Sequence, residues 1–104
     1  MNPLEMLKNL QNMQETMKQL QEKMKTITAE GRAGGDLVKV TVNGQLEVLK
    51  VELAPECVDP RDIPMLADLI RLAANDAMVR VKERMKDELG PMTQGLGLPG
   101  MFGG

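Results

Sequence analysis

Lysine and arginine side chains gather in two segments of this 104-residue sequence, and such cationic groups bind anions such as phosphate. Residues 71–86 contain five of these cationic side chains and two acidic ones, Asp76 and Glu83, so the local net charge is +3. These five are Arg71, Arg80, Lys82, Arg84 and Lys86. The other group contains Lys18, Lys23, Lys25 and Arg32, interrupted by Glu22 and Glu30. Both segments are therefore candidate anion-binding surfaces.

A purely structural explanation of these charges is also open. Residues four apart lie on the same face of a helix, so Asp76 can pair with Arg80 and Arg84 with Glu88. Exposed pairs of this kind contribute little to stability and require no ligand. The whole chain has thirteen cationic and fifteen acidic residues, a net charge of −2, which does not by itself indicate an anionic partner. The cations support anion binding as a set rather than individually.

The residue types needed for catalysis are largely missing. The sequence has no His, Ser, Tyr or Trp, and its single cysteine is Cys57. One cysteine without histidine cannot supply the roughly four ligands of a structural zinc site, and it cannot form an internal disulfide. The acidic residues show no paired arrangement typical of acid/base catalysis. We therefore expect a protein that is not an enzyme, with no metal and no cofactor.

The N-terminal segment predicts a long helix with one narrow apolar stripe. Its apolar residues alternate at spacings of four and three: Met6, Leu10, Met13, Met17, Leu20, Met24 and Ile27. This is a heptad pattern, which indicates contact with a partner helix, and Pro3 suits a first helical turn. Two arrangements satisfy it, a helix packed on the protein core and a coiled-coil-like arm.

Residues 30–36 contain three glycines in five positions and are predicted to end this helix as a flexible connector. Residues 37–42 alternate apolar and polar and predict a strand, and Asn43-Gly44 is typical of a type I′ hairpin turn. A second strand is expected at residues 45–53, where the alternation slips by one near Leu49 and indicates a bulge.

A second long helix is predicted after residues 54–60, with Asp59 or Asp62 as its cap and Pro60 or Pro64 in its first turn. Its first half, up to Ala77, is apolar over a wide arc and is expected in the core, whereas its second half has only a narrow stripe. Gly90-Pro91 is expected to end the helix, and residues 91–104 to form a flexible Gly/Pro-rich tail. Residues 1–90 then form one domain.

These elements predict a tight homodimer of an α+β fold. A helix of about 25 residues spans roughly 38 Å and a seven-residue strand roughly 23 Å, so helix 1 must overhang the hairpin on which it lies. The second helix could cover the overhang, but sheet edges and an apolar helix face stay exposed. A second copy would cover them, with the first half of helix 2 near the two-fold axis. The expected dimer and core residues are Leu66, Leu69, Ile70, Ala73, Ala74 and Ala77.

The sequence indicates a cytoplasmic protein without a membrane span. Its longest apolar runs have only about three or four residues, far fewer than the roughly twenty that cross a bilayer. The N-terminus also lacks the apolar run of a signal peptide.

Nearly the whole chain resembles the bacterial YbaB/EbfC family. The resemblance rests on the order and spacing of GGDLVKVTVNG at 34–44, VLKVEL at 48–53 and DLIRLAANDA at 68–77. The Met-rich first helix and the GLPGMF tail are also similar to that family. The resemblance implies a dimer with tweezer-like helical arms and a nucleoid-associated role in which double-stranded DNA is the partner. The two groups of cations listed above then become the candidate DNA-binding residues.

The mode of DNA binding follows from what the sequence lacks. Phe102 is its sole aromatic residue, which disfavours the base stacking used by single-strand and RNA binders. No helix-turn-helix spacing, zinc finger or basic zipper is evident, so base readout is unsupported. We expect contacts to the duplex backbone with little sequence specificity and strong salt dependence. The alternative is a protein-interaction adaptor that uses the Met-rich stripe and the C-terminal tail.

Overall fold

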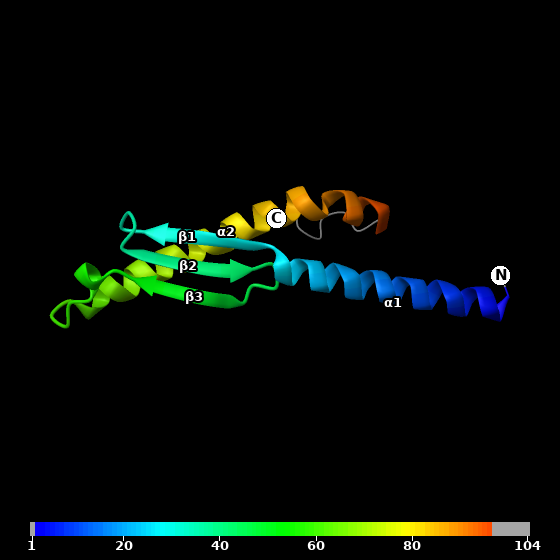
Figure 1. Ribbon diagram of the computed structural model, residues 1–104, viewed down its shortest axis with the longest axis horizontal. Helices are drawn as coiled ribbons and strands as arrows, with labels where there is room; N and C mark the ends of the chain where they lie inside the picture. Colours follow the sequence, from blue (N-terminus) through cyan, green and yellow to red (C-terminus); the bar gives the residue numbers. More distant parts are fainter. Residues whose placement is uncertain (1, 97–104) are drawn as a thin grey trace.

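The computed structural model describes the backbone of residues 2–96 and the side chains of residues 2–90. In chain order the elements are helix α1 (Pro3–Thr26), strands β1 (Thr28–Ala33), β2 (Val38–Asn43) and β3 (Val48–Leu53), the 3-10 turn η1 (Pro55–Cys57) and helix α2 (Ile63–Leu96). Helix α2 lies along one face of the sheet, and α1 points away from it (Figure 1). The predicted α+β class with two long helices is confirmed.

Both long helices begin at side-chain caps. The Asn2 side chain accepts a hydrogen bond from the Glu5 N–H at 2.8 Å, with Pro3 in the first turn. Asp62 accepts from the Met65 N–H at 3.2 Å, so Asp62 rather than Asp59 caps α2. Each cap satisfies a backbone donor that the helix itself leaves unpaired.

The sheet has three antiparallel strands in the order β1-β2-β3. The predicted bulge is present: Thr41 pairs with Lys50 and Val42 with Val48, so Leu49 is the extra residue on β3. This slip lets Val48 and Val51 lie on the same face of the sheet although they are three residues apart.

The glycine-rich segment was wrongly predicted to be a connector. Residues Glu30 to Ala33 belong to β1, and the turn into β2 takes only residues 34–37, in which Gly34 and Gly35 have positive φ. Gly31 is required for packing rather than for flexibility. A Cβ atom there would lie 2.2 Å from both the Ala73 carbonyl oxygen and the Ala77 nitrogen of α2. Glycine therefore lets the backbones of β1 and α2 touch.

The loop between β2 and β3 is longer than the predicted two-residue turn. β3 begins at Val48 rather than Gln45, and the positive φ of 62° falls on Leu46 instead of on Asn43 or Gly44. The Asn43 side chain organises this loop because its Oδ1 accepts from the N–H groups of both Gln45 and Glu47. Gly44 serves a close approach, since its N–H donates to the Met24 carbonyl at 2.9 Å.

The core lies between α2 and the inner face of β1 and β2. The α2 residues that are fully buried repeat every four positions: Ala73, Ala77, Val81, Met85 and Leu89. Opposite them lie Val38, Val40 and Val42 of β2, all within 1% exposure. The prediction that the first half of α2 supplies the core was therefore incomplete, because this buried line runs mainly through the second half.

Helix α1 was predicted to lie on the sheet, but most of it does not. Only Leu20, Met24 and Ile27, at its C-terminal end, pack against the body of the protein, and Ile27 lies just beyond the helix. The N-terminal part projects away from the sheet as an arm (Figure 1), and the molecule is 70 Å long. Of the two arrangements left open by the heptad pattern, the structure has the arm, because α2 already occupies the single covered face of a narrow sheet.

Helix α2 also continues beyond its predicted end. Its backbone stays helical through Gly90 and Pro91 to Leu96. The backbone of residues 91–96, which was predicted as the start of the tail, is thus helical, and residues 97–104 lie outside the described part of the chain.

Candidate nucleic-acid interface

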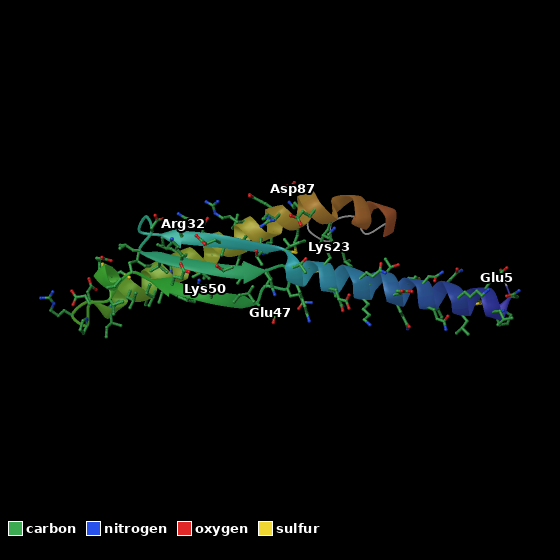
Figure 2. The ribbon with its side chains drawn as sticks, viewed as in Figure 1. Glu5, Lys23, Arg32, Glu47, Lys50 and Asp87 are labelled. Atoms are coloured by element: carbon green, nitrogen blue, oxygen red, sulfur yellow. The ribbon has the colours of Figure 1, made fainter. Side chains whose placement is uncertain are left out.

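The predicted cationic residues of α1 are all solvent-exposed. Lys18 and Lys25 are seven residues apart and share one face of the helix, and Lys18 borders a groove together with Leu10, Met13 and Met17. Lys23 points from the C-terminal end of α1 toward the side on which α2 lies (Figure 2). None of the three forms an ion pair with another described residue.

Two arginines of α2 are held by neighbouring groups of the protein. Arg80 donates to the Asp76 carboxylate at 3.0 Å, and Arg84 donates to Glu88 at 3.0 Å, which confirms both predicted i,i+4 pairs. Arg84 also donates to the backbone carbonyl of Thr28 on β1. Their shared face is therefore turned toward the outer edge of β1, and their guanidinium groups are already engaged there.

Arg32 and Asp76 complete this contact along the β1 edge. The Arg32 side chain pairs with Asp36 at 2.7 Å and Glu30 at 2.9 Å, which raises the pKa of the guanidinium. Its backbone N–H donates to the Asp76 carboxylate at 3.1 Å. That hydrogen bond, and then the one from Arg80, lower the pKa of Asp76. Side chains of α2 thus satisfy backbone groups at the free edge of β1.

The lysines of α2 are free of such contacts. Lys82 and Lys86 are exposed and form no ion pair within residues 2–90. Four residues apart, they share a face that is turned away from the Arg80 and Arg84 face. The five cations of α2 therefore do not form one surface, and Arg71, which lies 3.7 Å from Asp68, belongs to neither pair.

The local positive balance of α2 depends on where the segment is cut. Extending residues 71–86 to 68–88 adds Asp68, Asp87 and Glu88, and the segment then holds five cationic and five acidic side chains. Two of the three added carboxylates are the ion-pair partners of Arg71 and Arg84. The +3 seen in the sequence is thus largely neutralised in the fold, and the unpaired lysines are what remains of it.

A shallow groove lies between β1 and α2 beside these arginines. It is lined by Ala29, Glu30, Arg80, Glu83, Arg84 and Asp87. Three carboxylates and two engaged guanidinium groups give it no excess of positive charge. The groove is therefore unsuited to a phosphate group.

Comparison with known proteins identifies the family. Residues 1–96 match the model of the YbaB/EbfC DNA-binding family. The chain belongs to this family. It is 41% identical over 101 residues to a nucleoid-associated protein of Pelotomaculum thermopropionicum, an alignment that covers 97% of this chain and 96% of the relative. It is 48% identical over 84 residues to one from Exiguobacterium sp., covering 81% and 80% of the two chains. These relatives are named nucleoid-associated proteins, and the family is not a known enzyme family.

A solved structure shares the fold. An uncharacterized Helicobacter pylori protein, HP0035, superimposes with a TM-score of 0.70 at 25% sequence identity. The match covers 89% of this chain and 98% of that one, so it includes both helices and the sheet. The arm and the α2-covered sheet are thus shared with a second protein.

The six residues predicted for the dimer or core of this YbaB/EbfC-family chain divide into two groups. Ala73 and Ala77 are fully buried under the β1 backbone. The others, Leu66, Leu69, Ile70 and Ala74, are half-buried at the margin of the core. The margin is incomplete on one side, because β3 extends beyond α2 and leaves Val48, Val51 and Leu53 exposed. Ala74 and Met78 flank the buried line of α2 on the side toward β3, opposite Asp76 and Arg80.

Sequence reasoning missed the part that Asp76 plays at the β1 edge. Arg32 and Asp76 are 44 residues apart, and Thr28 and Arg84 are 56 apart, so no local spacing could reveal these contacts.

Residues 2–96 contain neither a membrane-spanning helix nor a metal-binding group. No helix there is long and apolar enough to cross a membrane. In the same part of the chain, no group of three or more His, Cys, Asp or Glu side chains is placed to hold a metal ion.

Proposed function

We propose that this protein binds duplex DNA through the phosphate backbone, with little sequence specificity, and thereby contributes to chromosome organisation and gene regulation in the bacterial nucleoid. The observation that carries the proposal, beside the family, is the set of exposed lysines without ion pairs. Among the predicted DNA-binding residues they are Lys18, Lys23, Lys25, Lys82 and Lys86, on the two long helices. An ammonium group that is not already paired can replace the counterions of a phosphate, which is the source of backbone affinity.

The arginines contribute less in this proposal than the sequence suggested. Arg80 and Arg84 would have to give up contacts with Asp76, Glu88 and the Thr28 carbonyl in order to reach a phosphate. Reversing their charge would also disturb the packing of α2 on β1. The lysines can be neutralised without touching any contact within the described residues, so they provide the cleaner test.

Fluorescence anisotropy with two unrelated duplexes of equal length, titrated at several salt concentrations, tests the proposal. We expect equal affinities and a steep fall with salt, with a slope of log K against log salt of about −0.9 for each phosphate neutralised. Replacing Lys18, Lys25, Lys82 and Lys86 by Gln should weaken binding to both duplexes alike and flatten that slope. The matched control is Lys39→Gln on β2, which should bind as the wild type does. Affinity that is independent of salt, or unchanged in the fourfold variant, would refute the proposal.

We further propose that the chain forms a homodimer through the apolar margin between α2 and β3, named here the α2–β3 surface. Its exposed or half-buried members are Val48, Val51, Leu53, Ile70, Ala74 and Met78. The β1 edge is closed by α2 side chains, whereas on the β3 side apolar groups meet water. Burying such a patch against its own copy would double the number of lysines that one DNA molecule meets.

Neighbouring residues of β3 give a matched test of this surface. Val51 and Glu52 point to opposite faces of the sheet. Light scattering should show that Val51→Glu reduces the assembly while Glu52→Gln does not. Equal masses for these two variants, or a wild type that is already monomeric, would count against the α2–β3 dimer.

A further inference from the structure

The N-terminal part of α1 has a second apolar surface, which the proposed function does not use. It is the exposed part of the heptad stripe, named here the arm seam: Met6, Leu10, Met13 and Met17. These side chains are 53%, 56%, 62% and 37% exposed. Part of the seam borders a shallow groove in which Leu10, Met13 and Met17 are flanked by Gln14, Gln21 and one charged side chain, Lys18. No described element of the same chain covers it, since α1 contacts the body only at its C-terminal end.

The seam has the spacing of a helix–helix contact. Met6 and Met13 occupy one core position of the heptad, and Leu10 and Met17 the other. A run of two heptads with an apolar residue at every core position fits another helix with the same repeat. Met side chains adapt to a facing surface of similar residues. The expected occupant of the arm seam is therefore an apolar helix.

The residues beside the seam favour a helix of the same sequence. The positions that flank it, Leu7, Asn9, Gln14 and Thr16, are all uncharged. Of the charged residues of this stretch, Lys8 and Glu15 lie on the outer face of α1, and Lys18 borders the groove beside the seam. When two identical helices run antiparallel, each flanking position faces the same heptad position of the other helix, so like charges there would repel each other. Uncharged flanks remove this barrier to self-association.

The antiparallel direction also aligns the apolar layers. With the two-fold axis between Leu10 and Met13, Leu10 of one chain faces Met13 of the other, and Met6 faces Met17. All four seam residues are then buried, and Lys18 is the one charged side chain at the border of the groove. We propose that the arm seams of two molecules pair in this antiparallel way.

Such pairing is separate from the α2–β3 dimer. The arm projects from one end of a molecule 70 Å long, and antiparallel arms would carry the two bodies away from each other in opposite directions. The copy that covers the arm seam therefore cannot also cover the α2–β3 surface. Two self-complementary contacts on one chain link molecules into larger assemblies, in which arms join one dimer to the next.

Sedimentation velocity across a concentration series tests the pairing on the full chain. The wild type should form species larger than dimers, and Met13→Glu should stop at the dimer because it places two carboxylates in the seam. Gln11→Glu, on the outer side of α1, is the matched control and should assemble as the wild type does. Adding Val51→Glu to Met13→Glu should leave monomers. Loss of DNA binding would not alter these masses, so the pairing and the proposed function can fail separately.

Disulfide trapping tests the direction of pairing. Leu10→Cys and Met13→Cys proteins should cross-link when they are mixed and oxidised, but neither should do so alone. The native Cys57 is 1% exposed and serves as the unreactive background. Cross-linking of each variant with itself would indicate parallel arms and overturn the proposal. A wild type that never exceeds the dimer, or Met13→Glu with the mass of the wild type, would also overturn it and leave the seam to DNA, to the C-terminal tail or to a different protein.

Discussion

The apolar stripes of the two long helices lie in opposite environments, although both stripes are regular. The buried line of α2 lies against the sheet, with Ala73 and Ala77 touching the backbone at Gly31. The stripe of α1 is the more regular heptad, yet most of it faces water. A sheet of three six-residue strands has room on one face for about one helix. Which of the two helices covers the sheet depends on the presence of small residues on the opposing strand, not on the regularity of the apolar stripe.

The largest effect is expected where α2 meets β1. Gly31→Val would place a side chain within 2.2 Å of α2 backbone atoms, which cannot move aside as a side chain can. Overpacking typically costs about 1–3 kcal/mol, and a clash with backbone should reach about 3 kcal/mol or more. Urea unfolding at fixed protein concentration measures the loss.

The matched control for Gly31→Val is a glycine of α2 with space around it. A Cβ on Gly90 meets no heavy atom within 4 Å. Gly90→Ala should therefore stabilise the protein by about 0.5–1 kcal/mol, through the lower entropy cost of alanine in a helix. If Gly31→Val cost as little as an ordinary surface change, the close contact of α2 with β1 would be disproved.

Two leucines on α1 compare the arm with the body within a single helix. Leu20 is 1% exposed and Leu4 is 70% exposed. Leu20→Ala should lose about 2–5 kcal/mol of unfolding free energy because it leaves a cavity against the body. Leu4→Ala should change it by less than about 0.5 kcal/mol. Equal losses in chemical denaturation would mean that the arm is packed along its whole length.

The smallest effect concerns the Asp76 contacts at the β1 edge. The pKa of Asp76 is lower in the folded chain than its ordinary value of 3.8, so the carboxylate favours the folded state above that pH. This contribution is lost as the pH falls through the lower, folded pKa. Asp76→Asn should therefore weaken the loss of stability below about pH 4. Denaturation curves between pH 2 and 6 test this, with Asp87→Asn as control. A variant with the acid sensitivity of the wild type would contradict it.

The elements that local chemistry determines were predictable from the sequence. The Asn43 turn region, the slip at Leu49, the caps and the proline in each first turn depend on residues a few positions apart. Strand β1 was not predictable in this way. Its inward residues are Ala29, Gly31 and Ala33, which read as a loop because their small size suits a helix backbone that lies 40 or more residues further along the chain.

The candidate site was predictable as a list of cations but not as a surface. The sequence showed the i,i+4 pairs of Arg80 and Arg84, but the contact of Arg84 with Thr28 needs the folded sheet. Because such contacts form only in the folded protein, the sequence alone could not distinguish the arginines that are bound to other groups of the protein from the free lysines Lys82 and Lys86. Side-chain availability depends on tertiary contacts, whereas charge and helical spacing do not.

The closure of the β1 edge also has a consequence for the order of folding. Strands β1 and β2 are joined by a short turn and can pair early, whereas Asp76 and Arg84 arrive only when α2 docks. Until then the strand has an open edge that another chain can join. We expect the interval between hairpin formation and helix docking to be the period in which this protein is most prone to aggregate. Helix α2 thus protects the folding chain from its neighbours before it contributes to any function.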